Sequence, residues 1–158
     1  MVKGIDMGAV LDYAKRWAYG RNPYYHSFDG LGGDCTNFIS QCLRAGGAAM
    51  NFTPDTGWYY LGLNDRAAAW TGVEFFYRFM MTNMGRGPFG CEVEQEDAEA
   101  GDIIQLGNSS LFYHTLIAVA AEGGEIYAAA HTTDVYGVPL SSYSYQRARF
   151  LRIREYRE

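Results

Sequence analysis

The chain has 158 residues, of which 48% are hydrophobic and 20% charged, and its formal net charge at pH 7 is −5. This length favours a single domain over residues 1–158, and the hydrophobic content excludes a disordered or low-complexity chain. The acidic balance disfavours a nucleic-acid partner, because nucleic-acid-binding proteins normally carry a basic surplus. Aromatic residues make up 16% of the chain and include 13 tyrosines, which suit clefts and interfaces as well as cores.

Neither a membrane span nor a leader is expected from the sequence. The longest weakly polar stretch, residues 115–121, is far shorter than the ~20 residues that a spanning helix needs. Met1 is followed by Val, Lys, Gly, Ile and Asp rather than by the apolar run of a signal peptide. We therefore expect no membrane partner, and either a cytoplasmic protein or a chain that lacks its leader or another domain.

The first half of the chain shows helical patterns. Apolar residues recur at helical spacing and predict helices over residues 5–19, 35–45 and 73–84. Between them lie a turn-rich segment, residues 21–33, and a loop rich in Gly, Pro, Asp and Tyr, residues 50–64. Asp34 is placed to cap the second helix, where its carboxylate would accept hydrogen bonds from first-turn amides.

Beyond Gly85 the pattern changes to strands. Short apolar and alternating runs, separated by glycines, predict strands at residues 91–95, 102–106, 113–121, 125–132 and 149–156. Helices followed by strands indicate an α+β fold with an antiparallel sheet.

The three cysteines do not suggest disulfides or a metal site. An odd count argues against a disulfide framework. Cys35 and Cys42 are separated by a helical rise of ~10 Å, which exceeds the ~7 Å limit for a disulfide bridge. No pair has zinc-ligand spacing, so neither a metal nor another cofactor is expected. Cys42 lies in an apolar helix stripe and Cys91 at a strand edge, and both are interpreted as structural.

Cys35 is the candidate nucleophile. It follows Gly32-Gly33-Asp34 and opens a helix, where unpaired amides and the helix dipole favour a thiolate. The backbone amide of Cys35 could also donate a hydrogen bond to an oxyanion, with Asp34 in a supporting position. The alternative interpretation of Cys35 is a small buried hydrophobic residue.

A cysteine nucleophile needs a base, and the chain has three histidines. His114 begins an apolar run and could point from the end of a buried strand into a cleft, although a structural histidine fits the same pattern. His26 lies in the turn-rich segment and is interpreted as a surface residue.

His131 is the candidate orienting residue. If Gly123-Gly124 forms a two-residue hairpin turn, Glu122 pairs with Glu125. His131 then lies opposite Leu116, on the same face as His114 and diagonal to it. A three-residue turn would move His131 to the other face. Asp134 is the alternative third residue, because carboxylates often orient a catalytic histidine.

The tyrosines cluster in predicted loops that flank these residues in sequence. We expect them to line the substrate cleft, with Tyr24, Tyr25, Tyr59 and Tyr136 as candidates. Tyr24 and Tyr25 could instead donate a hydrogen bond to an oxyanion.

Several blocks of this sequence resemble a known family. They are Asn22–Tyr25 (NPYY), Gly32–Leu43 (GGDCTNFISQCL), Gly101–Ile104 (GDII) followed by His114, and His131–Asp134 (HTTD). Together they resemble the family named "Putative amidase domain", which is grouped with the NlpC/P60 and CHAP cell-wall hydrolases in the papain-like clan. The resemblance extends from Tyr13 to Ile153.

This resemblance implies a papain-like fold of the NlpC/P60 type, with N-terminal helices packed on a twisted antiparallel sheet. It also implies a thiol-protease-like site with Cys35 as nucleophile, His114 as base and a third polar residue, His131 or Asp134. The expected reaction is hydrolysis of an amide or peptide bond through a thioester, and peptidoglycan stem peptides are one implied substrate. Acyl transfer at the same site, a binding module that uses its Tyr-rich loops and a purely structural protein are the alternatives.

Overall fold

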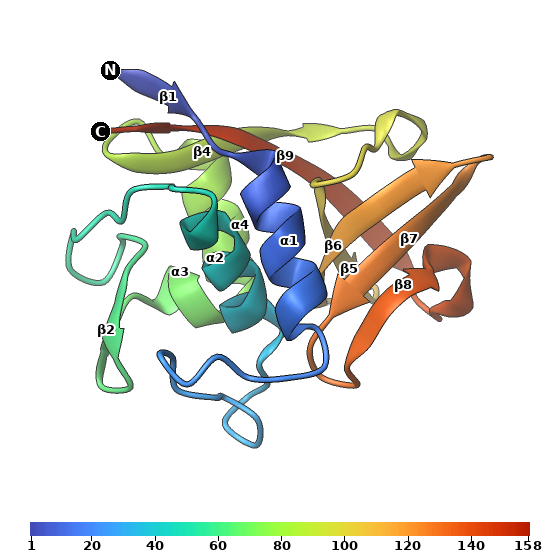
Figure 1. Cartoon of the computed structure of the whole chain (residues 1–158), viewed down its shortest axis with the longest axis horizontal. Coiled ribbons are helices and arrows are strands. Elements are labelled where there is room, and N and C mark those ends of the chain that lie inside the picture. Colours follow the sequence, from blue (N-terminus) through green and yellow to red (C-terminus); the bar gives the residue numbers. More distant parts are fainter.

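The computed structural model describes residues 1–158 and shows an α+β protein, in which helices cover one face of a twisted antiparallel sheet (Figure 1). The predicted fold class is therefore confirmed at the level of α+β with an antiparallel sheet. None of the helices is long and apolar enough to cross a bilayer.

The three predicted helices are present with shifted ends. They are α1 (Met7–Trp17), α2 (Cys35–Ala45) and α4 (Val73–Thr82). Helix α1 begins two residues later than expected because Asp6 is its N-cap, accepting a hydrogen bond from Ala9 N at 3.1 Å. The short helix α3 (Ala68–Thr71) and the hairpin β2 (Tyr60–Gly62) and β3 (Asp65–Arg66) were not predicted.

The main sheet has seven strands in the order β1-β9-β5-β6-β7-β8, with β4 also paired to β9. All of its strand pairs are antiparallel. The strands are β1 (Val2–Gly4), β4 (Gly87–Val93), β5 (Ile103–Gly107), β6 (Phe112–Glu122), β7 (Glu125–Ala130), β8 (Val135–Pro139) and β9 (Arg147–Arg157). The chain also contains two 3₁₀ turns, η1 (Gln95–Asp97) between β4 and β5 and η2 (Leu140–Ser142) between β8 and β9.

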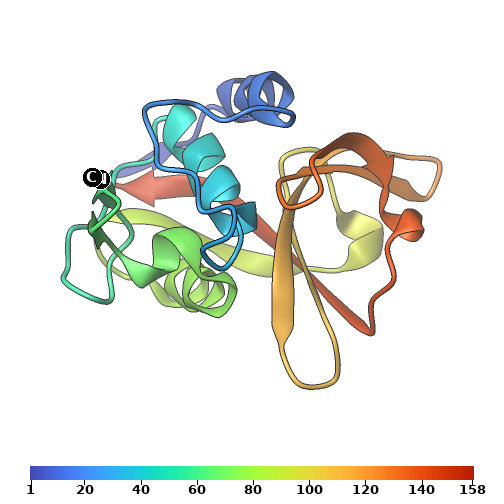
Figure 2. The same ribbon diagram turned by 90° about the horizontal axis from the view of Figure 1, so that it is seen from below.

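The sheet separates two hydrophobic cores because neighbouring strand residues point to opposite faces. Ile103 and Ile117 join the larger core under the helices, whereas Ile104 and Leu116 join the smaller core on the other face. Figure 2 shows the helices gathered on one side and β6, β7 and β8 curling away on the other.

The hairpin of β6 and β7 begins in the predicted register and then leaves it. Glu122 pairs with Glu125 across Gly123-Gly124, and both glycines have positive φ, as a tight hairpin turn requires. A bulge at Val119 then shifts the pairing by one residue, so that Ala118 faces Ala128.

The shift makes the expected position of His131 opposite Leu116 wrong. Strand β7 ends at Ala130, and Thr132 and Thr133 follow with φ of 64° and 60°. Because these left-handed residues cannot continue a strand, His131 lies in a turn rather than in the sheet.

Candidate active site

Cys35 is the first residue of α2 and follows a tight glycine turn. Gly32 and Gly33 have φ of 95° and 103°, a conformation that favours glycine, and this turn delivers the chain into the helix. Cys35 is 7% exposed, and its Sγ lies 3.8 Å from Thr36 Oγ1. The amides of the first helical turn have no partner within the helix, so they could stabilise a thiolate or an oxyanion at this position.

A buried hydroxyl pair ties the start of α2 to the strand that carries His114. Thr36 Oγ1 and Thr115 Oγ1 are 2.9 Å apart, and both residues are fully buried. Thr36 follows Cys35 in the chain and Thr115 follows His114. The contact therefore fixes the start of α2 against β6. Because neighbouring strand residues point to opposite faces, the His114 side chain points away from Thr115, toward the smaller core that contains Leu106 and Leu116.

His114 is held in its neutral form. Burial lowers the pKa of its imidazole from 6.5 to about 4. Its ring lies 6.0 Å from the ring of Tyr143, measured between centroids, and makes no hydrogen bond. In particular, no hydrogen bond joins His114 to Cys35 in this structure.

His114 lies in a pocket of about 490 Å³, which we call the His114 pocket. Its other lining residues are hydroxyl-bearing or apolar and uncharged: Tyr113, Thr132, Thr133, Val135, Val138, Ser142 and Tyr143. Thr132 Oγ1 accepts a hydrogen bond from Asp34 N at 3.3 Å. The pocket wall therefore touches the backbone immediately before Cys35.

Asp34 occupies the N-cap position of α2 but does not cap it with its side chain, so that expectation is wrong. Its Oδ1 accepts hydrogen bonds from Phe28 N and Asn37 Nδ2, both at 2.8 Å. Its Oδ2 lies 2.5 Å from His131 Nδ1. The fully buried carboxylate is thus directed toward the preceding loop and His131 instead of the helix amides.

His131 is 1% exposed and is enclosed by groups other than His114. Its Nε2 lies 2.7 Å from the carbonyl oxygen of Trp17, and its ring stacks on Phe38 with centroids 4.0 Å apart. Arg21 Nη1 also lies 3.0 Å from Nε2, and Asp34 lies at Nδ1, so both ring nitrogens are occupied by partners other than His114. The structure does not bring these two histidines together as the sequence predicted.

Arg21 links this region to Asp134 and was missed in the sequence. Its guanidinium donates to both carboxylate oxygens of Asp134, at 2.9 and 3.0 Å, and to both of Asp29, at 2.8 and 3.2 Å. Arg21 Nε also lies 3.5 Å from Asp34 Oδ2. We call Arg21, Asp29, Asp34, His131 and Asp134 the Arg21 cluster. In the sequence, this role was indicated only by the fact that Arg21 is the one lysine or arginine in the turn-rich segment, residues 21–33.

The Arg21 cluster joins blocks that are remote in sequence. Hydrogen bonding to Arg21 holds the pKa of Asp29 below its ordinary value, which shows that the pair favours the ionised carboxylate. Asp134 is engaged by Arg21 rather than by His114. In this structure, both candidates for the third catalytic residue therefore hold the loops around Cys35.

The predicted cleft tyrosines lie outside the His114 pocket. Tyr24 is 76% exposed and meets Tyr25 edge to face, while Tyr25 packs beside Trp70, and burial raises its pKa to about 12. Tyr59 packs against Phe52, and Tyr136 N donates a hydrogen bond to the Tyr19 hydroxyl. The tyrosines that do line the pocket are Tyr113 and Tyr143.

Comparison with known proteins places this chain in a family. Residues 4–154 match the profile of the family described as "Putative amidase domain". The uncharacterized protein YhbB of Bacillus subtilis is 35% identical over 125 residues, which cover 76% of this chain and 38% of YhbB. The uncharacterized protein YjcM of the same organism is 25% identical over 147 residues, or 87% of this chain and 33% of YjcM.

The chain thus spans about a third of the length of these relatives. No solved structure matches it. The family profile covers nearly the whole chain and includes Cys35, His114 and the Arg21 cluster, and on this basis the chain belongs to the Putative amidase domain family.

Proposed function

We propose that this chain is a cysteine hydrolase of papain-like type, which cleaves an amide or peptide bond through a thioester. The observation that carries the proposal is the place of Cys35 as the first residue of α2, directly after the Gly32-Gly33 turn, where unpaired helix amides favour a thiolate and could hold an oxyanion. The family description points to amide hydrolysis, and the helix-on-sheet arrangement is compatible with the NlpC/P60 and CHAP clan.

In the proposed reaction, His114 takes the proton from the Cys35 thiol, and the thiolate attacks the carbonyl carbon of the substrate. The Cys35 amide donates a hydrogen bond to the oxyanion that forms. His114 then gives its proton to the leaving amine as the C–N bond breaks. Water attacks the resulting thioester, which releases the acid and restores the thiol.

The neutral state of His114 suits the first step, because a base must be unprotonated before it can accept a proton. Formation of the thiolate would then favour the imidazolium by charge attraction. The proposal requires the two side chains to meet when substrate binds, since no hydrogen bond joins them in the free protein. Catalytic hydrogen bonds are often long in free enzymes and tighten in the complex.

A peptide is the proposed substrate class, and peptidoglycan stem peptides are one candidate within it. The experiment incubates the protein with a library of neutral peptide amides and follows the intact protein by mass spectrometry. We expect an acyl adduct on Cys35 and release of ammonia or amine, both lost in Cys35→Ser. Adduct formation followed by transfer to added amine rather than to water would identify an acyltransferase, whereas absence of any adduct and product would contradict the proposal.

A further inference from the structure

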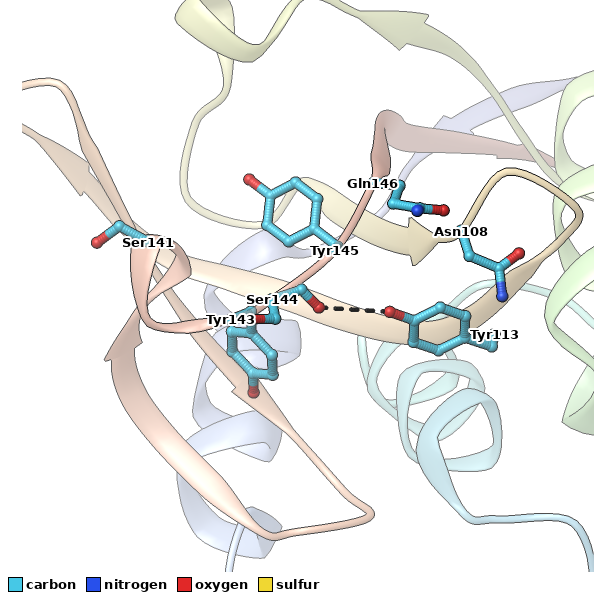
Figure 3. Close-up of a pocket in the computed structure, with 7 residues that line it drawn as sticks. All are labelled: Asn108, Tyr113, Ser141, Tyr143, Ser144, Tyr145 and Gln146. Carbon is cyan, nitrogen blue, oxygen red and sulfur yellow. Dashed lines mark hydrogen bonds between the residues drawn. The ribbon is translucent and has the colours of Figure 1, made fainter.

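A second pocket adjoins the His114 pocket and is larger, with a volume of about 720 Å³ (Figure 3). We call it the tyrosine pocket. Its wall consists of Asn108, Gln146, two serines and the aromatic rings of Tyr113, Tyr143 and Tyr145. Tyr113 and Tyr143 line both pockets, so the second pocket lies directly beside the pocket of the proposed base, His114.

The tyrosine pocket contains no charged side chain. An ionic ligand would therefore find no counter-ion in its wall. The three tyrosines instead offer broad apolar ring surfaces with polar hydroxyl tips. Figure 3 shows Tyr143 and Tyr145 projecting on different sides of the segment that carries Ser144, with Tyr113 facing that segment from β6.

The side-chain amide of Asn108 is fixed with its NH₂ group available to a ligand. Its Oδ1 accepts hydrogen bonds from Ser110 N at 2.8 Å and Leu111 N at 2.9 Å, and this assigns oxygen and nitrogen unambiguously. Its Nδ2 has no partner in the protein. The turn after β5 thus holds a hydrogen-bond donor at the pocket wall.

Gln146 repeats this arrangement. Its Oε1 accepts a hydrogen bond from Ser109 N at 2.6 Å, and its Nε2 has no partner in the protein. The hydroxyl groups of Tyr143 and Tyr145 also make no hydrogen bond within the chain. The pocket therefore presents two fixed amide donors and two adaptable hydroxyls beside aromatic rings.

From this combination we infer that the tyrosine pocket binds a neutral saccharide. The aromatic rings can pack on the apolar C–H faces of a sugar ring, and the amide donors can bond its oxygen atoms. Neither interaction requires a charged group on the sugar or on the protein. Its role as a substrate subsite beside the scissile amide rests on the proposed function, whereas saccharide binding itself does not.

The experiment titrates maltotriose, cellotriose and chitotriose, with triglycine amide as the peptide probe, into the full chain and follows binding by calorimetry and NMR. We expect one of the trisaccharides to bind at the tyrosine pocket and triglycine amide not to do so. Binding of the peptide alone, or of no saccharide, would overturn the inference.

Two isosteric variants test the amide donors. Asn108→Asp and Gln146→Glu keep the oxygen that accepts the turn amides but remove the NH₂ group, so each should weaken saccharide binding at least about fivefold while the fold is retained. Asn64→Asp, which introduces the same charge at an exposed position outside both pockets, should leave affinity unchanged. Equal affinity in all variants would contradict the assignment.

The aromatic contribution is tested by Tyr145→Ala, with Phe52→Ala as an exposed aromatic control outside both pockets. Only Tyr145→Ala should reduce binding. Cys35→Ser should bind the saccharide with wild-type affinity. If the acyl adduct fails to form but saccharide binding follows this pattern, the proposed function is contradicted and the binding site stands.

Discussion

Asp34 Oδ2 lies 2.5 Å from His131 Nδ1. This contact joins the sequence block that contains Cys35, residues 32–43, to the turn at residues 131–134. Asp34 immediately precedes Cys35, so any movement of His131 would be transmitted to the start of α2. Because both side chains are nearly inaccessible to solvent, the pair positions the cysteine without being exposed to substrate.

The first prediction concerns this buried pair. Asp34→Asn and His131→Ala should each lower the free energy of unfolding by about 1–3 kcal/mol, because each disrupts the buried contact between Asp34 Oδ2 and His131 Nδ1 while the other partners of the remaining residue stay in place. Urea unfolding followed by circular dichroism measures the loss. Asp12→Asn, an exposed carboxylate on α1, is the matched control and should change stability by less than about 0.5 kcal/mol. A loss no larger than that of the control would contradict the role assigned to the pair.

The second prediction concerns the hydroxyl contact between α2 and β6. Thr36→Val and Thr115→Val should be coupled by about 1 kcal/mol in a double-mutant cycle, because either change removes the same buried hydrogen bond. Each should also slow alkylation of Cys35, since the nucleophile would lose its fixed position. Thr56→Val, in an exposed loop, should do neither. Additive stability effects would show that the contact contributes nothing.

The third prediction concerns the pH dependence of stability. The folded protein holds His114 neutral down to a pH of about 4, whereas the unfolded chain protonates this residue near 6.5. The unfolded state therefore binds more protons between these values, and stability should fall as the pH drops through this window, by at most about 3 kcal/mol.

His114→Gln should flatten this part of the stability curve, as measured by urea unfolding between pH 4 and 7. His26→Gln, which changes an exposed histidine, should leave the curve as it is in the wild type. An unchanged slope in His114→Gln would mean that His114 titrates alike in the folded and unfolded states.

The fourth prediction concerns Arg21. Arg21→Lys should loosen the loop over residues 21–33, because a lysine ammonium cannot reproduce the paired hydrogen bonds to Asp29 and Asp134. Limited proteolysis should cut this loop faster in the variant than in the wild type. Arg78→Lys, on α4 outside the cluster, is the control. Equal cleavage rates in both variants would contradict the proposed anchoring.

The helices and the hairpin turn were predictable because their determinants are local. Apolar spacing defined α2, and Gly123-Gly124 defined the turn that pairs Glu122 with Glu125. The bulge at Val119 has no local signal, since one valine in an apolar strand looks like any other. That single extra residue shifted the register, and it explains why His131 was misplaced.

The environment of the candidate site could be predicted only in part. Sequence reasoning identified Cys35, His114, His131 and Asp134, but contacts between distant segments decide which of them meet. Arg21 bonds to Asp134, 113 positions away, and no local pattern indicates such a pair. The tyrosines were assigned to a cleft by clustering, yet Tyr143 lines the His114 pocket, whereas Tyr24 does not.

The central claim is that Cys35 is an activated nucleophile, and the other two cysteines of the chain serve as controls. Cys91 is exposed, while Cys42 is fully buried and burial raises the pKa of its thiol. The decisive measurement is the rate of iodoacetamide labelling at each cysteine between pH 5 and 9, mapped by mass spectrometry in the wild type and in His114→Ala.

We predict that Cys35 is labelled well below the ordinary thiol pKa of ~8.5 and faster there than the exposed Cys91, and that Cys42 stays unlabelled. His114→Ala should remove the low-pH reactivity of Cys35 and leave Cys91 unchanged. If Cys35 reacts no faster than Cys91 at every pH, or if its profile is unaffected by His114→Ala, the account of this site is contradicted.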